Sequence, residues 1–270
     1  MRIALAQIAS SADPTHNLGL VHSWAGRAAD QGARLVVFPE ATMASFSTSP
    51  LRHAEPLSGS WADGVREIAS RLGIVVVAGM FTPGSSGRVR NTLLVTGEGV
   101  EASYDKIHLY DAFDSRESET IEPGSRLVTF DFDGLTFGLA TCYDIRFPAQ
   151  FTDLAKAGAM AILVPASWQG GPGKVDQWQI LCRARALDST SYVVGCGQAN
   201  PEAAGTGTAT GPTGIGHSMV VAPDGRVVGE LTDGPDLLVA DLDLDLVCRA
   251  RATLPVLTAP GVSRPETHIT

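Results

Sequence analysis

The sequence predicts an α/β (α+β) protein in which two β-sheets pack face to face and helices cover their outer faces. Two observations support this fold class. The chain combines about ten segments of strand length with about four amphipathic segments of helix length. In addition, residues 35–38 and similar runs are apolar throughout, which is typical of strands buried on both faces. Such strands need a second sheet on one side and helices on the other.

The N-terminal part of the chain alternates strands with helices. Residues 2–8, 35–38 and 74–78 are the predicted strands. A helix is predicted to begin at Asp13-Pro14, because Asp accepts hydrogen bonds at a helix N-cap and Pro fits the first helical position. This helix ends near Gly32. The next one, over residues 60–72, ends at Gly73, since glycine adopts the left-handed conformation at a helix end without strain.

The rest of the chain adds strand pairs to this alternation. Two pairs are joined by short turns, Gly97-Glu98-Gly99 and Asp133-Gly134, and each therefore predicts a hairpin. Cys248 falls in a charged tail. No linker or change in composition divides the chain, which predicts a single domain over residues 1–270. The predicted strands of this part are 89–96, 100–106, 127–132, 135–141, 160–164, 192–195, 217–221, 226–231 and 237–242, and the predicted helices are 148–157 and 175–187.

The composition excludes several classes of partner. The 270 residues carry 20 Lys and Arg against 29 Asp and Glu, a formal net charge of −9. Such an acidic chain offers no basic stripe for phosphates, so neither nucleic acid nor an anionic membrane surface is expected as a partner. No window approaches the ~18 apolar residues of a membrane helix. The initial apolar stretch is shorter than expected for the core of a signal peptide, and the four cysteines lie mostly in apolar segments, which together predict reduced thiols in the cytoplasm. A small molecule is the favoured partner.

Several cofactor and metal motifs fail on inspection. Residues 170–174 read G-G-P-G-K, but a phosphate-binding P-loop would need glycine at Trp168 and Ser or Thr at Val175. The glycine-rich segment 205–216 does not connect a buried strand to a helix, so a dinucleotide site is not expected. The six histidines form no pair at metal-ligand spacing, and no C-x-x-C occurs. The sequence therefore predicts neither a cofactor nor a metal.

Three segments each place a reactive side chain where an apolar strand ends. Glu40 follows L-V-V-F-P, Lys106 lies within S-Y-D-K-I-H-L, and Cys142 begins a turn from a strand into a helix. Backbone N–H groups at such a turn favour a thiolate and can hold an oxyanion. The ordinary alternatives are a solvated loop glutamate, a surface lysine and a buried core thiol.

Taken together, F-P-E at 38–40, Y-D-K-I-H-L at 104–109 and T-C-Y-D-I-R-F-P at 141–148 resemble the Glu-Lys-Cys triad of the nitrilase, or carbon–nitrogen hydrolase, superfamily. The cysteine motif is similar to that of the Nit-like amidase branch, which includes omega-amidases and deaminated-glutathione amidases. The resemblance implies a four-layer α-β-β-α sandwich of two mixed β-sheets and a homodimer or larger homo-oligomer. The likeness continues through P-A-S-W at 165–168, R-A-R-A-L-D at 183–188 and G-H-S-M-V-V-A-P-D-G at 216–225.

The resemblance also implies the chemistry, which is cysteine-dependent hydrolysis of a non-peptide C–N bond in a small amide, giving a carboxylate and ammonia. Cys142 would form a thioester, Glu40 would transfer protons, and Lys106 with the backbone N–H of Tyr143 would hold the oxyanion. A second glutamate, best matched by Glu117, would orient Lys106 or the substrate. A nitrilase, an N-carbamoyl amide hydrolase and a catalytically silent binding protein on the same scaffold remain alternatives.

The substrate-binding candidates are Tyr143, Arg146 and Trp168, which lie on loops expected near the site. Arg146 could pair with a substrate carboxylate, and Lys174 would add positive charge nearby. For Arg146 the favoured interpretation is instead an ion pair with Asp144 or with a glutamate at a dimer contact. Trp168 fits a pocket wall and a plain core position equally well.

Overall fold

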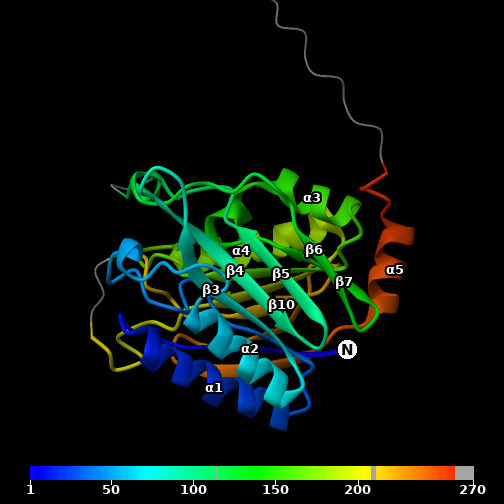
Figure 1. The fold of residues 1–270 in the computed structure, drawn as a ribbon. Helices are drawn as coiled ribbons and strands as arrows, with labels where there is room; N and C mark the ends of the chain where they lie inside the picture. Colours follow the sequence, from blue (N-terminus) through cyan, green and yellow to red (C-terminus); the bar gives the residue numbers. More distant parts are fainter. Residues whose placement is uncertain (113–114, 208–210, 259–270) are drawn as a thin grey trace, which may run out of the picture.

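A computed structural model describes residues 1–112, 115–207 and 211–258 of the chain (Figure 1). Its strands form two sheets of six. The first sheet has the order β12-β1-β2-β3-β4-β5 and consists of β12 (Asp236–Asp241), β1 (Arg2–Gln7), β2 (Leu35–Val37), β3 (Val75–Pro83), β4 (Val89–Gly97) and β5 (Val100–Asp105). The second has the order β11-β10-β9-β8-β7-β6 and consists of β11 (Val227–Glu230), β10 (Met219–Val221), β9 (Tyr192–Gly197), β8 (Ala161–Ala166), β7 (Leu135–Leu139) and β6 (Thr129–Phe132).

Both sheets are mixed and follow the same pairing pattern. In the first sheet β1, β2 and β3 are parallel and are flanked by antiparallel neighbours. In the second sheet β7, β8 and β9 are parallel and are likewise flanked by antiparallel neighbours. The parallel strands are the buried apolar runs of the sequence, as expected for strands covered on both faces.

The helices lie outside the sheets (Figure 1). Helix α1 begins as the sequence predicts, since Asp13 Oδ1 accepts a hydrogen bond from the Thr15 N–H at 2.9 Å and Pro14 occupies the first turn. Helix α2 ends at Gly73 with a left-handed φ of 62°. The helices are α1 (Pro14–Asp30), α2 (Ser60–Leu72), α3 (Pro148–Lys156), α4 (Lys174–Ser189) and α5 (Leu244–Thr253), with short 3₁₀ helices η1 (Pro50–Arg52), η2 (Glu117–Glu119) and η3 (Cys142–Arg146).

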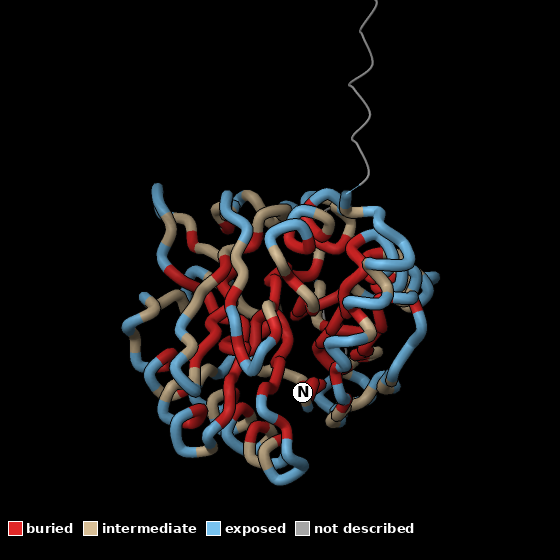
Figure 2. The backbone as a smooth tube through the Cα atoms, turned by 90° about the vertical axis from the view of Figure 1, so that its right-hand side faces the viewer, coloured by how far each residue is buried: buried red, intermediate tan, exposed pale blue. Residues whose placement is uncertain are grey.

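Three apolar clusters define four layers. One cluster joins the inner faces of the two sheets, for example Leu5 and Val37 of the first sheet with Leu163 and Val194 of the second. A second cluster packs α1 and α2 on the first sheet, and a third packs α3 and α4 on the second. The buried backbone accordingly gathers in the interior, and the exposed backbone at the rim (Figure 2). The predicted α-β-β-α sandwich is confirmed.

Two local predictions were wrong. Cys248 lies in helix α5, not in a charged tail; Asp243 caps this helix by accepting a hydrogen bond from the Asp245 N–H, and Val247 is buried. Val247 is the one buried residue of α5, so the charged residues around it conceal a narrow apolar face. Strand β3 runs on to Pro83, beyond the predicted end at residue 78, because its antiparallel pairing with β4 continues to Val89.

Among the described helices, none is long and apolar enough to cross a membrane. Two predictions fall partly outside the described residues: the glycine-rich segment includes 208–210, and the predicted single domain extends over 259–270.

Candidate active site

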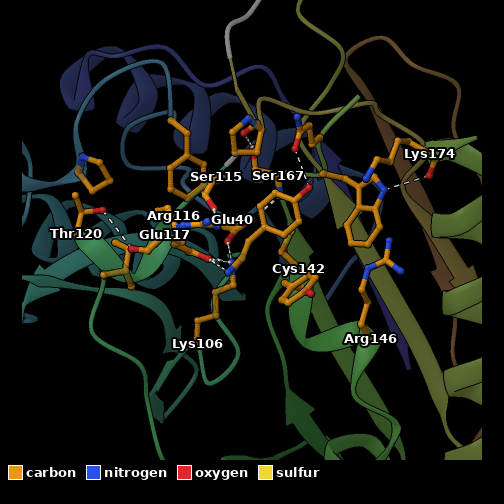
Figure 3. A pocket seen from close by; sticks show the side chains of 18 residues that line it. Glu40, Lys106, Ser115, Arg116, Glu117, Thr120, Cys142, Arg146, Ser167 and Lys174 are labelled. Atoms are coloured by element: carbon orange, nitrogen blue, oxygen red, sulfur yellow. Dashed lines mark hydrogen bonds and ion pairs between the residues drawn. The ribbon is translucent and has the colours of Figure 1, made fainter. Parts of the chain in front are cut away.

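The predicted catalytic side chains follow strands of both sheets and meet in one cavity (Figure 3). Glu40 lies three residues after β2, and Lys106 directly follows β5, both in the first sheet. Cys142 lies three residues after β7 in the second sheet, and Glu117 begins η2. The cavity that these four residues line has a volume of about 200 Å³. The sandwich thus brings together four residues that are far apart in the sequence.

Lys106 lies between the two glutamates. Its Nζ is 3.0 Å from Glu40 Oε1 and 2.9 Å from Glu117 Oε2. Only 2% of the Lys106 side chain is exposed, against 1% for Glu40 and 10% for Glu117, so water screens these charges little. Burial lowers the pKa of Lys106, but the charges of Glu117 and Glu40 outweigh burial and raise that pKa well above its usual value. Lys106 is therefore a permanent cation in the cavity.

The Glu40 carboxylate is held from several sides. Besides Lys106, the Asn91 Nδ2 of β4 donates to Glu40 Oε1 at 2.7 Å. The backbone N–H of Ser167, directly after β8, donates to Glu40 Oε2 at 2.8 Å. The Gln198 Nε2, after β9, donates to the Glu40 backbone carbonyl at 2.9 Å. The first sheet therefore supplies the glutamate, and the second sheet helps to orient it.

Cys142 occupies the first position of η3 and has a φ of 46°, in the left-handed region that is unfavourable for residues other than glycine. Burial raises the pKa of the Cys142 thiol well above its usual value, and the charge of Glu40 raises it further, while Lys106 lowers it. The expectation that this turn favours a thiolate was wrong. The thiol is only 8% exposed and the 3₁₀ helix is five residues long, so desolvation dominates.

Asp144 ties the cysteine turn to the lysine segment. Its Oδ1 accepts the backbone N–H of His108 and faces the His108 Nδ1, both at 2.8 Å. Its Oδ2 accepts the Tyr104 hydroxyl at 2.6 Å and the Thr141 N–H at 2.8 Å. Tyr104 and His108 flank Lys106 at two residues on either side, and Thr141 precedes Cys142. The two motifs of the sequence are therefore connected through one fully buried carboxylate.

The ion pair of Arg146 with Asp144 was predicted wrongly, whereas a pair with a glutamate at a dimer contact stays a prediction. Asp144 is surrounded by the donors just described, and the Arg146 Nη2 instead donates to Gln177 Oε1 in α4 at 2.6 Å. The guanidinium carbon lies 5.2 Å from the centroid of the Trp168 ring, a cation–π contact. Arg146 also lines the cavity that contains Cys142. Arg146 is the last residue of η3, and Figure 3 shows its side chain among those that line the cavity.

Tyr143 and Trp168 both form part of the cavity wall. Trp168 is 5% exposed and packs against Trp178 at 5.4 Å between ring centroids, so it is a pocket wall and a core residue together. The Trp168 indole N–H donates to the Lys174 carbonyl at 3.1 Å, which anchors the start of α4 at the cavity. Lys174 lines the cavity as well. The G-G-P-G-K segment thus contributes a side chain to this site.

Other residues that shape the site were not predicted from the sequence. Asn91, Ser167 and Gln198 were not predicted, and Asn91 gives no signal in the sequence because Arg90 and Thr92 on either side of it are polar as well. The Tyr110 hydroxyl donates to Gln169 Oε1 at 2.8 Å, a hydrogen bond between two segments of the cavity wall. Neither residue carries a signal in the sequence, because both lie in irregular loops. Over the described parts of the chain, no group of three His, Cys, Asp or Glu side chains is arranged to hold a metal ion.

Comparison with known proteins agrees with this arrangement. Residues 2–252 match the family model described as carbon-nitrogen hydrolase. A hydrolase of Mycobacterium tuberculosis H37Rv is 55% identical over 265 residues, which cover 95% of this chain and 94% of that protein. The deaminated glutathione amidase of Escherichia coli O157:H7 is 31% identical over 98% of this chain and 99% of that protein.

Solved structures with the same architecture include Nit3 of Saccharomyces cerevisiae, described as a member of the nitrilase superfamily. Its TM-score is 0.83 at 27% identity, and the match covers 95% of this chain and 94% of that one. A cysteine-to-alanine mutant of the amidase from Nesterenkonia sp. AN1, in complex with butyramide, has a TM-score of 0.78 at 32% identity and covers 94% and 95% of the two chains. The family match and these likenesses show that the chain belongs to the carbon–nitrogen hydrolase family.

Proposed function

We propose that this chain is a cysteine-dependent amidase that hydrolyses a small amide to a carboxylate and ammonia. The observation that carries the proposal is the meeting of Glu40, Lys106 and Cys142 in one buried cavity, with Lys106 within 3.0 Å of the Glu40 carboxylate. A thiol, a carboxylate base and a fixed cation are the groups that acyl transfer from an amide requires. Amidases among the structural neighbours support the same chemistry.

In the first half-reaction, Glu40 accepts the thiol proton of Cys142 as the sulfur attacks the amide carbon. Such a base is needed because the pKa of the Cys142 thiol is raised by burial, so the resting group is protonated. The negative charge that develops on the carbonyl oxygen is held by the Lys106 ammonium and the Tyr143 N–H. Glu40 then gives the proton to the nitrogen, the C–N bond breaks, ammonia leaves, and a thioester on Cys142 remains.

In the second half-reaction, water hydrolyses the thioester. Glu40 takes a proton from the water as its oxygen attacks the thioester carbon, and the same two donors hold the oxyanion again. The C–S bond breaks, the proton returns to the sulfur, and the carboxylic acid product is released. Glu117 accepts hydrogen bonds from Lys106 and from the Tyr110 N–H, at 2.6 Å for the latter, and so fixes the ammonium in place.

We further propose that the amide substrate carries a carboxylate at its other end. Arg146 and Lys174 line the cavity together with Cys142. Burial lowers the pKa of Lys174, and the charge of Arg146 lowers it further, which indicates two cations close to one another. A substrate carboxylate in this part of the cavity would pair with the Arg146 guanidinium. Relatives named deaminated glutathione amidase and omega-amidase support a small amide as the substrate.

The proposal is tested by ammonia release from matched compounds. Succinamic and glutaramic acids, the neutral butyramide, a nitrile and a ureide of similar length are compared with wild-type protein and with Cys142→Ala. We expect hydrolysis of the amides only, the acidic amides to be preferred, and the variant to fold but to be inactive. A covalent acyl adduct on Cys142, detected by mass spectrometry, would identify the nucleophile. Full activity of Cys142→Ala, or preference for the nitrile or ureide, would contradict the proposal.

Localisation in the cytoplasm and assembly as a homodimer or larger homo-oligomer are also proposed. All four cysteines are free, which suits a reducing compartment. Helix α4 exposes 65% of Ile180 and 47% of Leu187, an apolar surface that a second copy would cover. Light scattering of the purified protein measures the assembly, and a monomeric mass would contradict it.

A further inference from the structure

We propose that Asn91 is a positioning residue that determines which oxygen of Glu40 exchanges the proton. The inference rests on the proposed function, because it concerns the base of that reaction. It starts from a fully buried asparagine at the third position of β4, between Arg90 and Thr92. Its position in β4 places the amide group between the two glutamates of the cavity.

The Asn91 amide group faces both carboxylates. Its Nδ2 donates to Glu40 Oε1 at 2.7 Å and to Glu117 Oε1 at 3.3 Å. The Lys106 Nζ bonds the same two oxygens, each at 3.0 Å. One neutral donor and one cation therefore bridge the glutamates side by side. The orientation of the amide is fixed, because its oxygen would be repelled by both carboxylates if the group were reversed.

The other end of the amide has no partner. Asn91 Oδ1 is buried and makes no hydrogen bond within the described structure. A buried unpaired acceptor is unfavourable for folding, and an apolar side chain of the same shape would avoid the penalty. The unpaired oxygen therefore indicates that the position is occupied for the sake of the Nδ2 donor and its two carboxylate partners.

The donors divide the two oxygens of Glu40 into different roles. Oε1 accepts from Asn91 and from Lys106, which together use both of its lone pairs. Oε2 accepts one hydrogen bond, from the Ser167 N–H, and has a second lone pair. Oε2 is thus the oxygen that takes the Cys142 proton. Without Asn91, one lone pair of Oε1 would become available. Oε1, which Lys106 holds in place, would then compete with Oε2 for the Cys142 proton.

The charged and titratable groups that face the Glu40 carboxylate are Lys106 after β5, Glu117 in η2 and Cys142 in η3. Removing the Asn91 Nδ2 donor takes a partial positive charge away from the surroundings of Glu40, Glu117 and Cys142. Negative charge on the Cys142 sulfur then becomes less favourable. The acid limb of the activity profile and the ionisation of the thiol should therefore both move to higher pH.

The test compares Asn91→Leu with a matched control, Asn17→Leu. Leucine has the shape of asparagine without its donor or its unpaired oxygen. Asn17 is also fully buried, but its side chain bonds Ser11 and the Met43 carbonyl outside the cavity. The measurements are the pH profile of kcat/KM for amide hydrolysis, the pH dependence of Cys142 alkylation by iodoacetamide, followed by mass spectrometry, and the melting temperature.

For Asn91→Leu we expect kcat/KM to fall about 10- to 100-fold, the loss that follows from one hydrogen bond to a charged group. The acid limb and the midpoint of alkylation should move up by about one pH unit, with little change in melting temperature. For Asn17→Leu we expect a lower melting temperature and an unchanged pH profile. If Asn91→Leu does not fold, Asn91→Ala takes its place.

Unchanged kcat/KM and an unchanged alkylation profile in the Asn91 variants would overturn the inference and leave the proposed function standing. The same would follow if the Asn17 control lost as much activity as Asn91→Leu. A wild-type protein that hydrolyses no amide would instead overturn the proposed function. The alkylation profile needs no substrate, so it would still decide whether Asn91 governs the ionisation of Cys142.

Discussion

Replacing Asp144 by asparagine tests whether this one carboxylate holds the lysine segment and the cysteine turn together. Oδ1 faces two donors of His108, and Oδ2 faces the Tyr104 hydroxyl and the Thr141 N–H. The new NH₂ must replace one of these oxygens. The His108 ring and the Tyr104 hydroxyl can reverse their roles and accept from it, but a backbone N–H cannot.

Either orientation of the new amide therefore leaves one buried backbone N–H without an acceptor, that of His108 or that of Thr141. An unpaired buried donor costs about 1–3 kcal/mol of the free energy of unfolding. The affected N–H lies two residues from Lys106 or one residue before Cys142. We therefore expect Asp144→Asn to lose about 2 kcal/mol of stability and at least ~10-fold in kcat, since misplaced catalytic groups lose rate steeply.

Denaturant titration gives the free energy of unfolding, and ammonia release gives kcat and KM. The matched control is Asp153→Asn in α3, where the same change affects a side chain that is 54% exposed and lies 3.8 Å from Lys156. The control should leave both quantities unchanged, because exposed ion pairs contribute little. An Asp144→Asn protein with wild-type stability and kcat within about twofold would refute the reasoning.

The remaining predictions concern the substrate, the pH dependence of stability and thiol reactivity. Arg146→Gln should lower kcat/KM for an acidic amide about 10- to 100-fold, the contribution of a charge-assisted hydrogen bond, and change that for butyramide little; equal losses for both compounds would contradict the substrate proposal. Hydrogen bonds from Ser85 and Arg90 lower the pKa of Glu122 from 4.5 to about 2. Because the folded pKa is the lower one, Glu122 stabilises the fold above pH 4.5 and loses this effect as the pH falls toward 2. Melting curves of Glu122→Gln should therefore lie below wild type at pH 7 and converge with it toward pH 2; a constant difference would argue against this linkage. Iodoacetamide should label the exposed Cys248 rapidly in the native protein, and peptide mapping should find no label on the buried thiols outside the cavity, Cys182 and Cys196.

Most of the fold could be predicted because its elements have local signals. The Asp13 cap and the glycine at position 73 set helix ends, and the apolar runs of β2 and β8 identify buried strands. Helix α5 could not be predicted in the same way, because its single buried residue, Val247, gives no periodic pattern. The length of β3 depends on its partner β4, which a local pattern does not contain.

The positions of Glu40, Lys106 and Cys142 could be predicted from three motifs, but their surroundings could not. The partners of Glu40 come from β4 and from the ends of β8 and β9, which only the packing of the two sheets brings near. The pKa of Cys142 was predicted in the wrong direction, because a turn is visible in a sequence and the depth of burial is not. The predicted pairing of Arg146 with Asp144 was also wrong, since Asp144 has other donors that the sequence did not reveal.

The division of the cavity between the two sheets has a consequence for how the protein becomes active during folding. The first sheet carries the base Glu40 and the cation Lys106, and the second carries the thiol and the Ser167 N–H that orients Glu40. Either sheet formed alone is chemically incomplete. A chain that has formed only one of the two sheets therefore lacks either the nucleophile or the base. Catalytic activity arises when the two sheets dock. Recovery of amide hydrolysis in a refolding experiment would accordingly report the formation of the interface between the sheets.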